Sequence, residues 1–310
     1  MARILLNFRS GFAGLREGFE ALGHEVLENL WAPGADELRG AALCVADFVD
    51  CARRLRRTLG LRKRLVAAGV PFVALNRDAP WNRGVHRSRL SVIAWLAPFD
   101  LYAAHSMQGA ERYARRSLYC SNAAREAVYR VSDAELRAMR EPGFYRWDVS
   151  FLGNLEAKRY PEHARRVEFL AALESMLGAP GVRTLFRHGA DLSDDEQVDI
   201  IRKSRINLST VAACDAGEEP SWGLPERCYG VPACGGFLLS DRRRHAATDF
   251  AADEWADYGS LEDCVACIRQ FLLRFDEARA IAERAQARVA RDHGYRQRAA
   301  LLLDSTIHAR

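Results

Sequence analysis

Short apolar runs alternate with amphipathic stretches along the chain, and this alternation limits the fold more than any other feature. The run ARILLNF (2–8) has the length of a buried strand, and a glycine-bearing turn follows it. The next stretch, LREGFEALG (15–23), carries apolar residues at helical spacing and ends in glycine, and HEVLENL (24–30) has strand length again. Strands that alternate with helices predict a parallel, doubly wound sheet.

The same alternation starts a second time after a short linker. The segment EPGFYRW (141–147) contains Pro and Gly, and a new strand-length run, DVSFLGN (148–154), follows it. The stretch PEHARRVEFLAALESML (161–177) then predicts a long amphipathic helix. A chain of 310 residues is longer than one hydrophobic core usually serves. We therefore predict an α/β protein with two Rossmann-like domains and a boundary at residue 145.

The charge of the chain limits its partners. The net charge of +4 is small for a nucleic-acid-binding protein, so we expect no nucleic-acid partner. We interpret the basic cluster at 53–64 as the solvated face of a helix and the cluster at 241–245 as a candidate phosphate contact. No apolar run is long enough for a signal-peptide core or a membrane span. We expect a cytoplasmic protein, and peripheral contact with a membrane stays compatible with the sequence.

The eight cysteines lie mostly in apolar segments, which is typical of packed, reduced thiols. Cys264 and Cys267 form a single C-x-x-C pattern without the second pair or the histidines that complete a zinc site. We therefore interpret this pair as packing residues and expect no metal.

The glycines of the first turn argue against a dehydrogenase. Gly11, Gly14 and Gly18 do not have the G-x-G-x-x-G spacing that brings backbone amides to a dinucleotide pyrophosphate. The Walker pattern of P-loop phosphotransferases and the G-x-S-x-G pattern of α/β-hydrolases are absent from the sequence as well.

Ligands of open parallel sheets bind beyond the carboxyl ends of the strands. In the second predicted domain, basic and amide side chains follow those strand ends: Asn154, Lys158, Arg159, Arg187 and His188. Arg227 adds a guanidinium group near the start of a predicted helix, and Pro225 suits the first turn of that helix. Because arginine can hold phosphate oxygens with two parallel hydrogen bonds, this set suits the diphosphate of a nucleotide.

Six segments, in order, resemble the spore maturation protein B-like glycosyltransferases, a branch of the GT-B fold. They are FVALNRDAPW (72–81), DVSFLGN (148–154), IIRKSRINLS (200–209), ERCYGVPACGGFLLSD (226–241), WADYGSLEDCVACI (255–268) and ARVARDHGYRQRAALLL (287–303). The resemblance covers most of residues 70–303, and its C-terminal half is the specific part. It implies two facing Rossmann-like domains, with an acceptor-side domain at 1–145, a donor domain at 146–290 and a final helix, 291–310, that returns to the first domain.

The resemblance also implies a nucleotide-sugar donor held mainly by the second domain, without a metal or another cofactor. The candidate donor-binding residues are Gly153, Asn154, Arg159, Arg187, His188, Glu226, Arg227 and Gly235. The chain departs from the family at Gly230, where relatives carry a glutamate that typically binds donor hydroxyls. Glu226 lies four residues earlier, on the same face of the predicted helix, and is the candidate substitute.

Two residues after strands of the first domain are candidate general bases. Asp78 would face the interdomain cleft and accept the proton of an acceptor hydroxyl, or it serves as an Asx-turn residue before Pro80. His105 has a side chain suited to proton transfer at neutral pH, and a structural histidine is the alternative.

These observations predict a metal-independent glycosyltransferase that moves a sugar from a nucleotide-diphosphate donor to a glycan, protein or small-molecule acceptor. A non-catalytic nucleotide- or glycan-binding protein and a sugar-nucleotide 2-epimerase are the alternatives, because one fold supports several functions. The segment 223–241 would form the donor-site helix and the next strand, with Gly235 at the helix end and Pro232 as the residue that kinks or shortens the helix.

Overall fold

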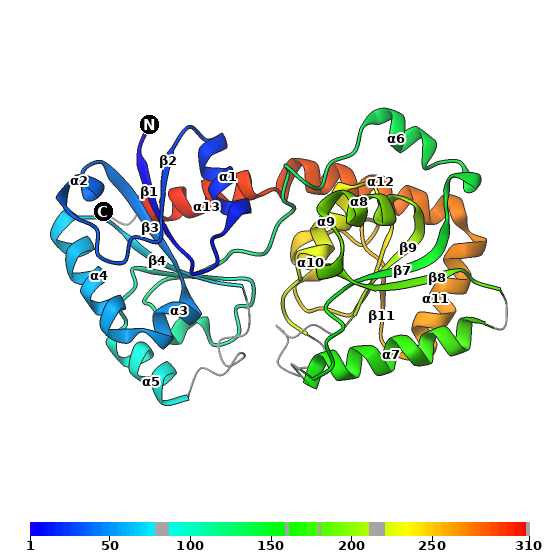
Figure 1. The fold of residues 1–310 in the computed structure, drawn as a ribbon, viewed down its shortest axis with the longest axis horizontal. Helices are drawn as coiled ribbons and strands as arrows, with labels where there is room; N and C mark the ends of the chain where they lie inside the picture. Colours follow the sequence, from blue (N-terminus) through cyan, green and yellow to red (C-terminus); the bar gives the residue numbers. More distant parts are fainter. Residues whose placement is uncertain (78–86, 159–160, 179–180, 211–220, 308–310) are drawn as a thin grey trace. The chain divides into compact units, whose positions relative to one another are not determined.

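The computed structural model describes residues 1–77, 87–158, 161–178, 181–210 and 221–307. The chain divides into two compact units. Unit 1 comprises Met1–Asn122 together with Gly294–Arg310, and unit 2 comprises Ala123–His293. Both units are parallel α/β layers, as the alternation of apolar runs predicts (Figure 1).

The sheet of unit 1 has the strand order β2-β1-β3-β4-β5-β6, and its neighbouring strands are parallel. Its strands are β1 (Arg3–Asn7), β2 (Glu25–Glu28), β3 (Ala41–Asp47), β4 (Phe72–Asn76), β5 (Leu101–Ala104) and β6 (Ser117–Tyr119). Its helices are α1 (Ala13–Ala21), α2 (Ala35–Leu38), α3 (Phe48–Arg53), α4 (Leu55–Ala68), α5 (Arg87–Leu96), η1 (Ala110–Arg112) and α13 (Tyr295–Ile307).

Helices cover both faces of this sheet because successive side chains of a strand point to opposite sides. Leu5 of β1 belongs to the core under α3, α4 and α5, together with Leu61 of α4 and Ile93 of α5. Its neighbours Ile4 and Leu6 are also fully buried and point to the other face, where α1 and α13 lie side by side (Figure 1).

The basic stretch after β3 forms two helices, whereas the sequence predicts one. The break falls at Arg54, whose φ of −123° and ψ of 48° leave the helical region. Asp47 caps the first helix by accepting a hydrogen bond from the Asp50 amide. The buried Thr58 hydroxyl donates to the carbonyl of Cys51 across the break, at 2.9 Å. Helix α3 therefore stays short, and Arg54 lies at an exposed corner between two helices.

The sheet of unit 2 has the order β11-β10-β9-β7-β8, with parallel neighbours. Its strands are β7 (Trp147–Gly153), β8 (Thr184–His188), β9 (Ser204–Ser209), β10 (Leu238–Asp241) and β11 (Asp257–Tyr258). Its helices are α6 (Asp133–Ala138), η2 (Pro142–Phe144), α7 (Pro161–Gly178), η3 (Gly189–Asp191), α8 (Asp194–Arg202), α9 (Arg227–Ala233), α10 (Ala246–Asp249), α11 (Leu261–Leu273) and α12 (Phe275–Asp292).

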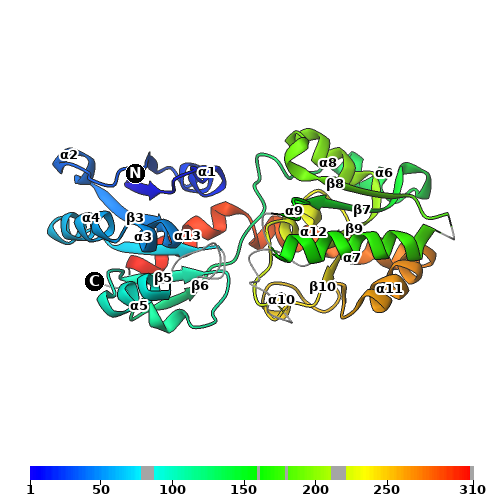
Figure 2. The ribbon, with the colours of Figure 1, turned by 60° about the horizontal axis from the view of Figure 1, so that its bottom comes forward.

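Two apolar layers enclose this sheet. Val149 and Phe151 of β7 pack under α7 and α11, and the stacked ring of Tyr258 from β11 joins the same core. On the other face, α8, α9 and the end of α12 pack around Tyr229. Figure 2 shows α8 on one side and α7 on the other side of β7 and β8.

The terminal helix α13 packs in unit 1, so the predicted return of the chain to the first domain is confirmed. A Cβ atom on Gly14 would lie 2.4 Å from the Tyr295 ring, and one on Gly18 would lie 2.4 Å from the Tyr295 carbonyl oxygen. Arg298 anchors the same helix through hydrogen bonds to the Ser121 carbonyl and hydroxyl oxygens, at 3.0 and 2.8 Å. Gly14 and Gly18, which lie in α1, therefore allow α13 to pack closely against that helix.

Residues 123–145 belong to unit 2, whereas the sequence places them before the domain boundary. The Ala124 amide donates to the His293 carbonyl, and Arg140 forms an ion pair with Glu283 at 2.8 Å. His293 stacks on Phe250 with ring centroids 5.4 Å apart. The chain thus changes units twice, at residues 122–123 and 293–294.

Helix α9 and the following strand match the expectation for residues 223–241. Helix α9 begins at Arg227, and Gly235 follows it with φ of +77°, the left-handed conformation that ends many helices. Pro232 is accommodated in the last turn of this seven-residue helix. Among the described cysteines, Cys264 is fully buried beside Val265 and Ile268, in agreement with a packing role.

Candidate functional site

The strand order of unit 2 marks a ligand site between β7 and β9. Read from β8, the order is β8-β7-β9-β10-β11, which is the doubly wound order 2-1-3-4-5 when β7 is counted as strand 1. In this order the connection after β7 runs toward one edge of the sheet, and the connection after β9 runs toward the other edge. Helices on opposite faces diverge at that point, and a crevice opens beyond the carboxyl ends of the strands. The predicted donor-site residues Gly153 and Asn154 lie at the carboxyl end of β7.

Gly153 and His188 are paired residues at the ends of β7 and β8. The backbone N–H of Leu155 donates to Nδ1 of His188 at 3.0 Å. That bond requires an unprotonated Nδ1, so the neutral ring carries its proton on Nε2. His188 therefore fixes the turn after β7 and keeps one N–H donor for a ligand.

Arg227 reaches the same edge from α9. Its guanidinium group lies over the Phe151 ring, 4.7 Å from the centroid. A Cβ atom on Gly153 would lie only 2.8 Å from Nη2 of Arg227. The absence of a side chain at residue 153 therefore allows the guanidinium group to lie against the backbone at the end of β7.

Arg166 is a further basic residue at this edge, and sequence reasoning missed it. It extends from α7, is 2% exposed, and lies 5.4 Å from the centroid of the same Phe151 ring. Its Nη1 donates to the Asn154 carbonyl at 2.7 Å. Its spacing in the sequence could have indicated that it is buried, because Arg166 lies four residues before Leu170, on the apolar face of α7. Two guanidinium groups thus flank Phe151 and give this edge a positive potential.

Asn154 shapes the turn through its own side chain. Its Oδ1 accepts a hydrogen bond from the Glu156 amide at 2.8 Å, which is the pattern of an Asx turn. Arg187, in contrast, is exposed on the opposite side of β8 from His188. The Arg187 charge helps to hold the pKa of Glu196 below its usual value, after the dominant hydrogen bonds from Ser193. Arg187 thus lies close enough to the first turn of α8 for its charge to act on Glu196.

A tyrosine occupies the space over Gly230. A Cβ atom on Gly230 would lie 3.1 Å from Cζ of Tyr129, tighter than most packed contacts. Tyr129 and Gly230 both line a cavity of about 50 Å³ that also contacts Arg227. Burial, followed by the nearby Glu226 charge, raises the pKa of the Tyr129 hydroxyl. Glu226 lies one helical turn before Gly230, since its carbonyl accepts from the Gly230 amide at 2.9 Å.

Two features lie away from this edge. Gly235 stands at the other end of α9, where a Cβ atom would lie 2.8 Å from Leu136, and its carbonyl accepts from Arg279 at 2.9 Å. In the cluster 241–245, Arg243 is buried and binds both carboxylate oxygens of Asp241, at 3.0 and 2.9 Å. Arg243 therefore stabilises the end of β10. The sequence predicts a phosphate contact from this cluster, but the Arg243 guanidinium group binds the Asp241 carboxylate of the chain itself.

In unit 1, His105 follows β5 and is 1% exposed, and its amide donates to the Asn76 carbonyl at 3.1 Å. Asp78 and Arg159 lie outside the described residues, so their predicted roles stay predictions. Within the described part of the chain, no three His, Cys, Asp or Glu side chains gather as metal ligands. The helices described there are all too short or too polar to cross a membrane.

Comparison with known proteins agrees with this architecture. A family model described as glycosyl transferase-like matches residues 133–304. A search of curated proteins gives no match. Sucrose-phosphate synthase from Thermosynechococcus elongatus has a similar fold, with a TM-score of 0.65, 11% identity and 99% coverage of both chains.

Two further solved structures are similar over the full length. HepE from Anabaena, in complex with UDP-glucose, gives a TM-score of 0.63 at 14% identity and covers 99% of this chain and 100% of its own. The trehalose 6-phosphate synthase from Burkholderia multivorans gives 0.58 at 12% identity, with 100% and 98% coverage. The family match spans more than half of the sequence and includes the β7 and α9 residues described above, so the chain belongs to the glycosyl transferase-like family and is a glycosyltransferase with the GT-B fold.

Proposed function

We propose that the chain transfers a glycosyl group from a nucleoside-diphosphate sugar, with UDP as the nucleotide, and that unit 2 binds the donor at the carboxyl edge of β7 and β8. The position of Arg227 against the backbone of Gly153 carries this proposal. HepE, which shares the fold, was solved with UDP-glucose, and this supports UDP as the first nucleotide to test. We place the chain in the spore maturation protein B-like branch because six sequence segments follow that pattern in order.

The chemistry of transfer explains why guanidinium groups belong at this edge. The bond between the anomeric carbon and the diphosphate oxygen breaks, and the diphosphate leaves with the bonding electrons. The acceptor hydroxyl forms the new bond to that carbon and gives up its proton to a base. Arg227, together with the Nε2–H of His188, would stabilise the negative charge that grows on the diphosphate, so no metal ion is required in this proposal.

The roles of the remaining candidates follow from their positions. Asn154 and Gly153 would present backbone groups of the β7 turn to the donor, and Arg166 would hold that turn in place. Glu226 would contact donor hydroxyls in place of the family glutamate. Asp78 and His105 are the proposed general bases toward an acceptor, which we propose to be a glycan, protein or small molecule. Free, apolar-packed cysteines support a reducing compartment, the cytoplasm.

A calorimetric titration with UDP, GDP, dTDP, CMP and ADP tests this proposal, together with a donor-hydrolysis assay on the matching sugar nucleotides. We expect UDP to bind and Arg227→Ala to weaken UDP binding by about 2 kcal/mol, roughly thirtyfold, since a charged hydrogen-bonding group is lost. Arg140→Ala is the matched control, because Arg140 pairs with Glu283 elsewhere in unit 2. Absence of binding by all five nucleotides, or equal UDP affinity in Arg227→Ala, would contradict the proposal.

A further inference from the structure

Positive charge is concentrated in one part of unit 1. Residues 51–99 contain eleven Arg and Lys and a single acidic residue, Asp78, which is an excess of ten positive charges. The whole chain carries +4, so the remaining residues are net negative by six charges. This asymmetry is large for a soluble enzyme of near-neutral total charge, and such a local field attracts an anionic partner.

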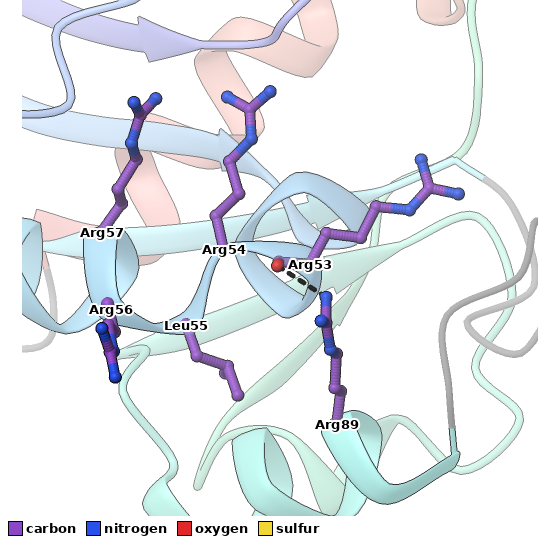
Figure 3. Close-up of a pocket in the computed structure, with 6 residues that line it drawn as sticks. All are labelled: Arg53, Arg54, Leu55, Arg56, Arg57 and Arg89. Carbon is purple, nitrogen blue, oxygen red and sulfur yellow. Dashed lines mark hydrogen bonds between the residues drawn. The ribbon is translucent and has the colours of Figure 1, made fainter.

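An arginine pocket lies at the corner between α3 and α4. Its volume is about 630 Å³, and its lining consists of Arg53, Arg54, Leu55, Arg56, Arg57 and Arg89. Figure 3 shows Arg54 and Arg57 pointing to one side of the corner and Arg56 to the other. Guanidinium groups that spread in this way suit several separate anionic groups better than one enclosed phosphate.

In the described chain, the α4 arginines of this corner differ from Arg62 in their ion pairing. Arg62, farther along α4, forms an ion pair with Asp100, and its Nη2 lies 2.8 Å from Oδ1. No described carboxylate forms such a pair with Arg54, Arg56 or Arg57. Arg89 donates to a backbone carbonyl, that of Arg53, at 2.8 Å. Helix α4 also begins without an acidic residue in its first turn and without a side-chain cap, so the positive end of its dipole adds to the field.

Exposed apolar side chains lie on the same two helices. Of the large apolar residues exposed in the described chain, four are on α4 and α5: Leu59 at 40%, Val66 at 59%, Val92 at 41% and Trp95 at 83%. An almost fully exposed tryptophan is unusual in a soluble protein, because its ring is favoured at boundaries between apolar and aqueous surroundings.

One exposed face of α4 alternates basic and apolar residues. Arg56, Leu59, Lys63 and Val66 are all exposed and follow a spacing of three, four and three residues, which places them on one side of the helix. Buried residues of the same helix, such as Leu61 and Leu65, face the core of unit 1. The outer face therefore combines positive charge and apolar surface, and no described residue of unit 1 covers it.

We propose that this face, defined by the α3–α4 corner and the outer surfaces of α4 and α5, docks unit 1 on a membrane that contains anionic phospholipids. The arginines would contact lipid phosphates, and Leu59, Val66 and Trp95 would enter the headgroup region. Unit 1 would lie on the membrane surface, where many lipid phosphates lie side by side. This inference is independent of the donor site, which lies in unit 2.

Vesicle sedimentation tests the proposal with the full chain. Vesicles of phosphatidylcholine alone are compared with vesicles of phosphatidylcholine and phosphatidylglycerol in equal parts. We expect preferential binding to the anionic vesicles that weakens as salt is added. The variant Arg54→Gln/Arg56→Gln/Arg57→Gln should partition about a hundredfold less, since each arginine near an anionic surface contributes roughly fivefold. Trp95→Ser should weaken binding with a smaller change in salt dependence.

Three comparisons make the outcome decisive. The variant Arg54→Lys/Arg56→Lys/Arg57→Lys keeps the charge and should bind almost as the natural chain does. Arg140→Gln/Arg274→Gln/Arg284→Gln removes the same charge from unit 2 and should leave vesicle binding unchanged. UDP titration of every variant reports on unit 2 and on folding. Equal binding to both vesicle types, unchanged binding of the triple glutamine variant, or binding of a short RNA duplex in place of vesicles would overturn the proposal.

Discussion

Strands β1 and β7 occupy equivalent places in their two sheets, yet the glycines of α1, which follows β1, and the glycine that ends β7 serve different purposes. Both strands hold the second position in a sheet whose order begins 2-1-3-4-5. After β1, Gly14 and Gly18 make room for Tyr295 of α13. After β7, Gly153 makes room for the charged end of Arg227. Helix α1 is therefore packed closely against the chain's own terminal helix, whereas the end of β7 holds a guanidinium group at the proposed donor edge.

The glycines of α1 and Gly153 thus allow a test of which residues contribute to folding and which contribute to ligand binding. A glycine that faces a packed helix contributes to stability, and its replacement should lower the free energy of unfolding. A glycine that faces a guanidinium group contributes to binding, and its replacement should weaken a ligand while the unit stays folded. Substituting these glycines one at a time distinguishes a role in packing from a role in binding.

The largest expected effect is that of Gly18→Ala. The new Cβ would meet the Tyr295 carbonyl oxygen at 2.4 Å, which is backbone and cannot turn away. We expect the free energy of unfolding to fall by about 3 kcal/mol, as for severe overpacking, in chemical denaturation followed by circular dichroism. Gly60→Ala is the matched control within α4, since no atom lies within 4 Å of its Cβ. It should stabilise by about 0.5–1 kcal/mol. Equal stability of the two variants would show that α13 is not held at this glycine.

The next effect, on binding, is that of Gly153→Ala. The Cβ would displace the Arg227 guanidinium group, 2.8 Å away, and also press on Phe151 at 2.8 Å. We expect about tenfold to thirtyfold weaker UDP binding by calorimetry, comparable to partial loss of a charged hydrogen bond, and a smaller loss of stability. Gly189→Ala is the control at the same edge, because its nearest contact is an ordinary 3.6 Å. If both variants bind UDP equally, Arg227 does not act through its position against residue 153.

The alternation of apolar runs predicts most of the strands and helices of this fold, but it does not predict which glycines contact a helix and which contact a guanidinium group. The strand-helix pattern places Asn154 and His188 at strand ends, because strand periodicity is a local property. Contacts between distant segments, such as Arg227 against Gly153 or Tyr295 against Gly18, depend on packing that no local pattern encodes. Arg166 was missed for the same reason: an arginine on the apolar face of a predicted helix has no local signal for the Phe151 ring that accepts it. The break at Arg54 was missed for another reason: it depends on local side-chain bonds, the cap at Asp47 and the Thr58 hydroxyl on Cys51, which helical periodicity does not register.

Gly230 lies in unit 2, near the proposed donor site. Because the Tyr129 ring packs against it, we expect its substitution to have a smaller effect on stability. A Cβ at residue 230 would press on the Tyr129 ring at 3.1 Å. We expect Gly230→Ala to cost about 1 kcal/mol of stability, since the ring has to shift. In a Tyr129→Ala background the same substitution should cost nothing, because the two residues are in contact and their effects do not add. Additive effects in the four proteins of this cycle would contradict a direct contact.

The smallest effect concerns His163, in the first turn of α7 on the donor side. Burial, helped by the Arg166 charge, lowers the pKa of His163, and the Glu156 and Glu162 charges oppose this shift. The folded state therefore binds a proton less readily than the unfolded state, so stability contributed by neutral His163 is present above its ordinary pKa of about 6.5 and declines as the pH falls below it.

A pH series of chemical denaturation measures this contribution. We expect the free energies of unfolding of the natural chain and of His163→Gln to run parallel above pH of about 7 and to approach each other as the pH falls. The glutamine keeps a polar side chain of similar size and cannot take up the proton. Parallel curves over the whole range would mean that His163 titrates alike in both states and that burial does not lower its pKa.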